Sequence, residues 1–478
     1  MATRQRVFVA VTPIPEVQLD ELRAVLASVD RRTGTAPFTN LRTTHFLRWT
    51  ILQERQNPEA GASSGEPRKA GDGRPFGPAL LLTSVFDGSR RKHLSELAAV
   101  LQDELREIYG AVVSGADRWS GEQIVKVVRR GSSGTNLYFN GTHLRTRDQI
   151  DLERTGWAWI QRELELPLMG FVGDPLSWIR RRMNDDDAPD WMRRWKRGPA
   201  FPIRPRPVLE ILLVLAILAG LTAFLAYRDA GSVVQSVRLG LSSLLTAVAL
   251  LFIVAGIVHA ALFRMVAEKE RQELESEPPP PSYLPDNTAD GDPSEREIGS
   301  ELNEITHLAP IKPGWIRLWT LWVVLFWLNL VARLFAARAM NLGGITTIHF
   351  GYWTIIGKPR RLLFVSHYDG TFENYLHDFA LLGTHYGVNA IWSNCVGFPQ
   401  TRRVFRGGAR ERVRRFVEFG RAFQHATQVW FRAYPNLPAV HINRNTLVRE
   451  GVLARLRWIG IRRWDSAEKD WMTLKRMT

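Results

Sequence analysis

The sequence predicts an α+β fold in which two ferredoxin-like units form an intrachain dimeric α/β barrel, together with a transmembrane helical hairpin. Three observations lead to this prediction. A pattern of strands and helices occurs twice along the 478 residues, each copy reads in the order βαββαβ, and two long apolar stretches separate the copies. The length is sufficient for two or three domains, each with its own core.

The repeat rests on two matching pairs of segments. "THFLRWTI" at residues 44–51 matches "IHFGYWTI" at 348–355. "LLLTSVFDGSRRKHL" at 80–94 matches "LLFVSHYDGTFENYL" at 362–376. The two pairs occur in the same order in both copies. In the second pair, both segments hold an apolar run that is followed by Asp-Gly. The sequence therefore indicates an internal duplication.

The elements of each copy follow from apolar runs and helical periodicity. We expect the first copy to place its strands and helices at 7–12, 19–29, 44–52, 79–86 and 92–109. We expect the second copy to place them at 305–309, 315–336, 347–356, 361–368, 372–386 and 390–396. The last of these ranges is the expected fourth strand of the second copy.

Residues 208–227 and 241–263 are almost wholly apolar and are each long enough to cross a bilayer as a helix. The flank before the first stretch is rich in Arg and Lys, whereas the loop between the stretches holds only Arg228 and Arg238. The positive-inside rule then predicts that both termini are cytoplasmic. The N-terminus has no long apolar core of a signal peptide, so none is expected.

A third apolar stretch, residues 314–336, leaves three alternatives. Trp315, Trp319 and Trp322 fall on one helical face, which favours a helix that lies in a membrane interface. Arg317, Asn329 and Arg333 interrupt the stretch and weigh against a third transmembrane span. The remaining alternative is a Trp-rich helix that covers the core.

These features divide the chain into six parts. A first ferredoxin-like unit with a disordered loop at 53–78 and a second unit with the Trp-rich helix at 314–336 flank the apolar hairpin, and Pro-rich or basic segments connect them. The predicted boundaries are 1–178 for the first unit, 179–206 for a basic linker, 207–264 for the hairpin, 265–300 for an acidic linker, 301–400 for the second unit and 401–478 for a basic extension.

The polar residues around the second Asp-Gly allow a structural and a functional interpretation. Gly can take a positive φ, and Asp can bond the following backbone or cap the next helix, which explains the repeat without catalysis. Alternatively, Asp369 and Arg402 could act as an acid/base pair with Glu373 beside them. The pocket would then contain the following residues: His367, Tyr368, Asn374, Trp392 and Asn394. Glu373 and His377 have a spacing that metal sites use, but it is too common to predict a metal.

Three segments, "FVSHYDGTFENYL", "IWSNCVGFPQTR" and "TQVWFRAYPNL", resemble a bacterial protein family without an assigned activity. Two ferredoxin-like units in one chain also resemble, in architecture, the dye-decolourising peroxidases and chlorite dismutases. That resemblance implies a haem-dependent, peroxidase-like oxidoreductase. Among the histidines, His441 is the favoured axial ligand. The alternative is a non-catalytic ligand-binding or docking module associated with a membrane.

The formal net charge of +15 implies an anionic partner. The Arg-rich residues 401–416 and the apolar stretches favour anionic membrane lipid, with a small-molecule ligand as a further partner. No nucleic-acid-binding signature occurs, so nucleic acid is not expected. The only cysteine, Cys395, lies in an apolar run and is interpreted as a packing residue. The predicted location is the bacterial cell membrane, with a multi-pass topology.

Overall fold

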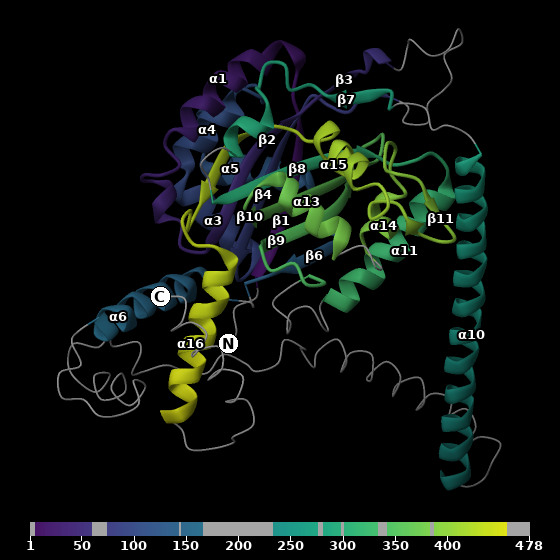
Figure 1. Ribbon diagram of the computed structural model, residues 1–478. Helices are drawn as coiled ribbons and strands as arrows, with labels where there is room; N and C mark the ends of the chain where they lie inside the picture. The colour runs from purple at the N-terminus through teal and green to yellow at the C-terminus, as the bar shows by residue number, and fades with distance from the viewer. Residues whose placement is uncertain are drawn as a thin grey trace.

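Two β-sheets lie face to face, and helices cover their outer faces (Figure 1). The structure is a computed structural model. It describes residues 5–59, 74–142, 145–165, 233–275, 281–297, 301–332, 342–382 and 387–456.

The first sheet has the strand order β13-β2-β4-β1-β5, and all neighbouring strands are antiparallel. Its strands are β1 (Gln5–Pro13), β2 (Thr44–Leu52), β4 (Ala79–Asp87), β5 (Ser132–Ser133) and β13 (Thr427–Arg432). The segments that the repeat predicted, residues 44–51 and 80–86, are therefore neighbouring central strands.

The second sheet has the order β6-β9-β10-β8 and is also antiparallel. Its strands are β6 (Leu137–Asn140), β8 (Leu302–Pro310), β9 (Ile348–Ile356) and β10 (Arg361–Asp369). In both halves, the strand with the His-Phe-x-x-Trp-Thr-Ile motif pairs with the strand that ends in Asp-Gly. The two copies thus share a local topology.

Each half gives one strand to the sheet of the other half. In the first half, β5 pairs with β1, and then the chain crosses to the second sheet, where β6 pairs with β9. In the second half, Gln424 bridges to His307 of β8, and then the chain crosses to the first sheet, where β13 pairs with β2. Each sheet is therefore built from both ends of the chain.

The main helices follow the strand order of each half. In the first half they are α1 (Leu19–Asp30), α3 (Arg90–Val100), α4 (Gln102–Gly110), α5 (Gly121–Arg130) and α6 (Arg147–Glu165). The rest are α10 (Val233–Leu274), α11 (Trp315–Val331), α13 (Phe372–Leu381), α14 (Val388–Trp392), α15 (Val413–Ala422) and α16 (Ala439–Leu456).

Three apolar clusters fill the layers. One packs α1, α3, α4 and α5 on the outer face of the first sheet, and a second packs α11, α13, α14 and α15 on the outer face of the second sheet. The third lies between the sheets, where Phe46 and Val85 meet Phe350 and Val365. The exchanged strands supply side chains to the core of the other half, as Phe139 of β6 does for the second-sheet core. The halves therefore share their cores.

Two buried ion pairs also join the halves. Arg361 of β10 donates two hydrogen bonds of 2.8 Å to the carboxylate of Glu54, which lies in the short strand β3 (Glu54–Gln56). Arg48 of β2 donates to Glu304 of β8. A buried charge is tolerated only when it is paired, so each pair depends on the correct docking of the two halves.

The predicted transmembrane hairpin is wrong. Among the described residues, no helix is both long enough and apolar enough to cross a membrane, which also contradicts the predicted multi-pass location. The first expected span, residues 208–227, lies outside the described residues. The second belongs to α10, which does not end at Phe263 but continues through charged residues to Leu274 and buries Glu270 against the rest of the fold.

Two further expectations differ from the structure. Residues 390–396 were expected to form a strand, but Val388–Trp392 is a short helix. Cys395 makes an isolated bridge to Ile311, just after β8, and Gln424 makes another to His307 of β8. The expected disordered loop at 53–78 and the expected acidic linker at 265–300 are partly structured, because β3 pairs with β7 (Tyr283–Pro285). The expected basic linker at 179–206 lies outside the described residues. Residues 60–73 of the first expected loop lie outside the described residues.

We expect the free energy of unfolding to decrease as the pH falls below about 6.5, the ordinary pKa of histidine. Burial lowers the pKa of His93 and of His307 to about 3, and that of His425 to about 4. Between these pKa values and pH 6.5, the unfolded chain binds more protons than the folded chain. The stability that the neutral, buried histidines contribute is therefore complete above pH 6.5 and is lost as the pH falls toward 3–4.

Urea unfolding at pH 7, 6, 5 and 4 measures this dependence. His93 stacks on Phe86 with ring centroids 3.9 Å apart, so His93→Phe should keep the packing and reduce the slope of stability against pH. The same change at the exposed His377 is the control. Equal slopes in His93→Phe and the unmodified protein would contradict the prediction.

Candidate functional site

The repeated histidines lie at equivalent β-bulges. The pairing of β2 with β4 skips His45, because Thr44 faces Phe86 and Phe46 faces Val85. The pairing of β9 with β10 skips His349 in the same way. A bulge turns the extra residue out of the regular alternation of the strand. Each histidine is thereby aimed at the carboxylate that ends the neighbouring strand.

The two aspartates of the Asp-Gly motifs contact these histidines. Nε2 of His45 lies 3.2 Å from Oδ1 of Asp87, and Nε2 of His349 lies 2.8 Å from Oδ1 of Asp369. Both imidazoles are fully buried. The carboxylates are almost as deep, with side chains that are 6% and 12% exposed.

The second oxygen of each aspartate accepts a hydrogen bond from the start of a distant helix. Oδ2 of Asp87 accepts from the backbone N–H of Arg147 at 2.8 Å, the first residue of α6. Oδ2 of Asp369 accepts from the N–H of Ala439 at 2.7 Å, the first residue of α16. A carboxylate is favourable at a helix N-terminus, where backbone N–H groups lack partners.

The histidine carbonyls complete the arrangement. The oxygen of His45 accepts from the N–H of Ala433, which follows β13, and the oxygen of His349 accepts from the N–H of Gly141, which follows β6, both at 2.9 Å. Each bulge therefore contacts an aspartate of its own half and accepts a hydrogen bond from the segment that follows an exchanged strand of the other half. We name these two sets the aspartate clamps: Asp87 with His45, and Asp369 with His349.

The contacts of the clamps bear on the two interpretations of the Asp-Gly corner, as a catalytic site or as a structural turn. Gly88 and Gly370 have φ angles of 91° and 87°, as the turn interpretation expected. The caps of the next helices come from Ser89 and Thr371, however, and not from the aspartates. Both oxygens of Asp369 are engaged in structural contacts. These contacts favour a structural role.

His367 and Tyr368 lie on opposite faces of β10. The ring of His367 stacks on Phe46 between the sheets, with centroids 4.1 Å apart, and burial first, with Arg48 and His349 nearby, lowers its pKa well below the ordinary value. Tyr368 stacks on Tyr375 at 3.9 Å in the helix-facing core, and burial raises its pKa well above the ordinary value. Strand alternation therefore separates two residues that were expected in one pocket.

Glu373 and Asn374 are exposed in the first turn of α13. Glu373 pairs with Arg421 at 2.9 Å. Partial burial acts to raise the pKa of Glu373, but the hydrogen bond and charge of Arg421, together with a backbone hydrogen bond, lower it on balance. Arg402 lies in the short strand β11 (Thr401–Arg402) and pairs with Glu411 at 2.7 Å. Figure 1 shows β11 beside α10, on the side of the molecule opposite to α16. The described contacts therefore do not bring Arg402 to Asp369.

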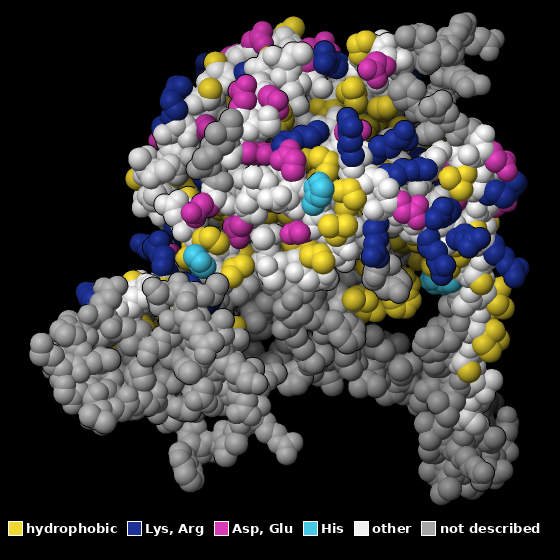
Figure 2. Space-filling model, viewed as in Figure 1, with side chains coloured by type: hydrophobic (Ala, Val, Ile, Leu, Met, Phe, Trp, Pro, Cys, Tyr) yellow, Lys and Arg dark blue, Asp and Glu magenta, His cyan; other side chains and the backbone are white. Residues whose placement is uncertain are grey.

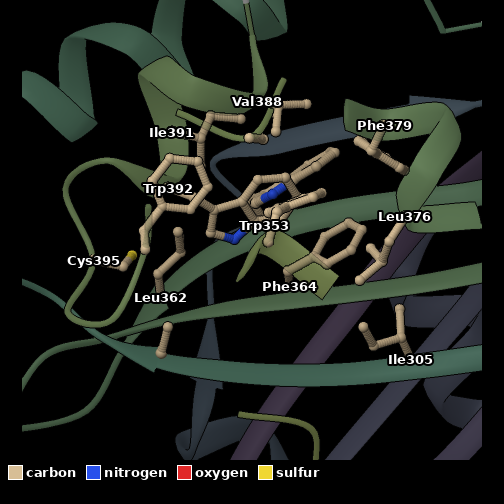
Figure 3. Close-up of a cluster of buried hydrophobic side chains, with 14 of the residues drawn as sticks. Ile305, Trp353, Leu362, Phe364, Leu376, Phe379, Val388, Ile391, Trp392 and Cys395 are labelled. Atoms are coloured by element: carbon tan, nitrogen blue, oxygen red, sulfur yellow. The ribbon is translucent and has the colours of Figure 1, made fainter. Parts of the chain in front are cut away.

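Trp392 and Asn394 are core residues. Figure 3 shows Trp392 among Trp353, Phe364 and Phe379, and its ring lies 5.2 Å from that of Phe364. Asn394 is fully buried and donates to the carbonyl of Ala390 at 2.8 Å. Both residues stabilise the short helix α14 and the turn that follows it.

His441 is exposed in the first turn of α16. Burial of part of the ring, followed by the charge of Arg444, lowers its pKa. An exposed helical histidine, an aspartate with both oxygens engaged and an arginine at another edge do not make a haem site. The residues present thus do not fit the haem that the resemblance implied. Among the described residues, no cluster of three or more ligating side chains could hold a metal ion.

The most unusual surface lies on α11. Its inner side packs Leu321, Val324 and Leu325 into the core, and its outer side is aromatic. The exposed fractions are 59% for Trp315, 61% for Trp319, 45% for Trp322, 63% for Phe326 and 48% for Trp327. We name this outer side the aromatic face. A single exposed apolar residue is ordinary, but a contiguous group marks an interaction site.

The aromatic face continues onto α10. Nε1 of Trp327 donates to Nε2 of His259 at 3.2 Å, which joins the two helices. Near this contact, α10 exposes Ile253, Val254, Ile257 and Val258. Figure 2 shows hydrophobic side chains along α10 and a gathering of Lys and Arg side chains beside its upper part. An apolar surface therefore borders a basic one.

The basic surface comes from residues 401–415. Its exposed cations are Arg402, Arg403, Arg406, Arg410, Arg414 and Arg415. We name this set the arginine rim. The arginine rim follows α14 in the sequence, and α14 packs with α11 in the second-sheet core.

The analysis of the sequence missed Glu270 and Tyr434. Glu270 is 1% exposed and accepts hydrogen bonds from the backbone N–H groups of Val404 and Phe405, although its sequence neighbours are typical of a solvated helix. The hydroxyl of Tyr434 lies 2.8 Å from Nδ1 of His45. The repeat did hold a signal for the clamps. In each copy a histidine near the start of one strand and an aspartate at the end of the next strand occupy equivalent positions.

Comparison with protein-family models, with curated proteins and with solved structures gave no match.

We expect Asp369→Asn and Asp87→Asn to reduce the free energy of unfolding by similar amounts, about 1–3 kcal/mol each. An amide has one acceptor oxygen, so it cannot replace both the histidine contact and the helix contact. Urea unfolding measures the loss. The control is Asp117→Asn, whose side chain is 63% exposed and should change stability by less than about 0.5 kcal/mol. A loss at Asp369 with none at Asp87 would contradict the equivalence of the clamps.

Proposed function

We propose that the protein is a docking module that binds an anionic lipid surface peripherally, through the aromatic face of α11 and the arginine rim. The observation that carries this proposal is the exposure of five large aromatic side chains on the outer side of α11, from Trp315 to Trp327. Trp is favoured at the boundary between lipid and water, because its ring is apolar and its N–H is polar.

Contacts on the inner side of α11 fix the rotation of this helix about its axis. Arg317, on the inner side, is 2% exposed and donates to Glu273 at 2.6 Å. Lys312, just before the helix, donates to the same carboxylate at 2.7 Å. Together with the buried Leu321 and Leu325, these contacts fix the rotation of α11. The aromatic face is therefore held outward.

The charge of the neighbouring surface selects the partner. Each basic side chain near an anionic leaflet contributes about 1 kcal/mol of attraction, which screening by salt reduces. Apolar contact alone would also suit another protein, but an apolar helix face bordered by exposed arginines is the pattern of interfacial lipid binding. This proposal requires insertion of side chains and no crossing of the bilayer.

The peroxidase-like alternative has weaker support. The aspartate clamp engages both oxygens of Asp369, His441 is exposed, and Arg402 pairs with Glu411 at another edge. No catalytic step through haem is proposed. A small-molecule ligand and the absence of nucleic-acid binding stay predictions.

We expect the purified protein to sediment with vesicles that contain phosphatidylglycerol and to bind neutral phosphatidylcholine vesicles far more weakly. The double change Trp319→Ser and Phe326→Ser should weaken the binding about a hundredfold, because each aromatic side chain contributes at least ~1.5 kcal/mol when it leaves water. Co-sedimentation at several lipid concentrations gives the partition coefficients.

The matched control is Val17→Ser, which removes an apolar side chain that is 92% exposed in the short helix Glu16–Gln18. It should leave binding unchanged. Equal binding by the double variant and the control, or equal binding to neutral and anionic vesicles, would refute the proposal.

A further inference from the structure

The arginine rim begins with a hairpin of unusual backbone geometry. Strand β11 pairs with β12 (Arg406–Gly407), and the three residues between them all have positive φ: 46° at Arg403, 61° at Val404 and 66° at Phe405. None is glycine. For such residues the left-handed conformation costs about 1–2 kcal/mol each, so the surrounding structure must hold it.

Asn389 holds the carbonyl side of the hairpin. Its side-chain amide donates to the oxygens of Phe405 and Gly407, both at 2.9 Å, and its Oδ1 accepts from Ala409 at 3.1 Å. A Cβ at Gly408 would lie 2.6 Å from that oxygen, so this position requires glycine. The loop is thereby fixed from one side without Glu270.

The N–H side of the hairpin surrounds a single carboxylate. Oε1 of Glu270 accepts from Oγ1 of Thr401 at 2.7 Å and from the N–H of Phe405 at 2.9 Å. Oε2 accepts from the N–H of Val404 at 2.7 Å. Consecutive backbone N–H groups that point to one side form a concave binding site for anions. Glu270 fills that site in this conformation.

The same hairpin also carries Arg402, Arg403 and Arg406, all exposed. Guanidinium groups bind phosphate oxygens through paired N–H donors. Backbone N–H groups, a threonine hydroxyl and several guanidinium groups on seven residues are donors of the kinds that phosphate sites use. A carboxylate has two oxygens and one charge, whereas a phosphomonoester has three terminal oxygens and a charge of about −1.5 to −2.

We propose that residues 401–407 bind a phosphomonoester group and that Glu270 is its intramolecular competitor. The inference rests on the proposed function, because it assigns the headgroup class that the docking surface prefers. A phosphomonoester displaces the Glu270 carboxylate from Thr401, Val404 and Phe405 and gains the arginines. The helix α10 stays attached through Glu273, which pairs with Lys312 and Arg317.

Calorimetric titration of the full chain with glycerol 3-phosphate tests the site without any lipid. Glu270→Gln removes the competing charge and keeps the size of the side chain. It should tighten the binding about tenfold, which corresponds to ~1.4 kcal/mol. The matched control is Glu268→Gln on the same helix, where the carboxylate is exposed and pairs with Arg271; it should not change the affinity. Unchanged or weaker binding by Glu270→Gln would overturn the proposal.

Two further measurements cover the case in which Glu270→Gln does not fold. Arg403→Gln with Arg406→Gln should weaken the binding of glycerol 3-phosphate at least about tenfold, since charge-assisted bonds are lost. In the unmodified protein, the phosphomonoester should accelerate amide hydrogen exchange in residues 268–275 of α10. The absence of either effect would overturn the proposal.

Vesicles separate this inference from the proposed function. Phosphatidic acid presents a phosphomonoester, whereas phosphatidylglycerol presents only a diester. Preference for phosphatidic acid supports a lipid headgroup as the ligand, and binding of glycerol 3-phosphate without vesicle binding identifies a free phosphomonoester and refutes the docking function alone. Binding of both vesicle types without any effect of glycerol 3-phosphate refutes the phosphate site alone.

Discussion

The exchange of strands between the halves is the constraint on which the rest of the structure depends. Strands β6 and β13 each complete a sheet that belongs mainly to the other half. The aspartate clamps lie where each exchange occurs. The rings of the bulged His45 and His349 contact an aspartate, and their carbonyls accept hydrogen bonds from the residues that follow the exchanged strands. The buried pair of Arg361 with Glu54 ties the same halves together. Neither sheet is complete without both ends of the chain.

This arrangement frees the outer helices for other tasks. The two sheets bury their polar clamps between them, and the second-sheet core takes only the inner side of α11. The outer side of that helix lies outside this core, yet it carries five exposed aromatic residues. Exposing so much apolar surface to water is unfavourable, so a selected function is the simplest reason to keep it. The neighbouring arginine rim gives that function a partner of opposite charge.

The sequence was informative where a local pattern repeats. The paired motifs at residues 44–51 and 348–355 placed two central strands correctly, and Trp315, Trp319 and Trp322 indicated one helical face, which the structure exposes. It was misleading where tertiary contacts decide. The apolar run of α10 continues into a charged segment that docks through Glu270, and the run at 390–396 packs Trp392 from a helix.

The candidate site shows the same limit. His367 and Tyr368 are adjacent in sequence, but strand alternation puts them in different cores. The crossing of β6 and β13 depends on pairing between residues more than 200 positions apart, such as Tyr138 with Tyr352. A search for local motifs cannot predict such pairing. What the sequence could show of the site was the repetition itself: His45 and His349 occupy equivalent positions in the two copies, and so do Asp87 and Asp369.

The depth of a spin label at position 319 tests the docking function most directly. Cys395 is the only cysteine, and burial raises the pKa of its thiol to about 12, so the label should react at an introduced cysteine alone. On phosphatidylglycerol vesicles, a label at Trp319→Cys should become accessible to oxygen and protected from a water-soluble nickel complex. A label at Leu447→Cys, an exposed position of α16, should stay in water. A label at position 319 that remains as accessible to nickel as the one at 447 would contradict the account.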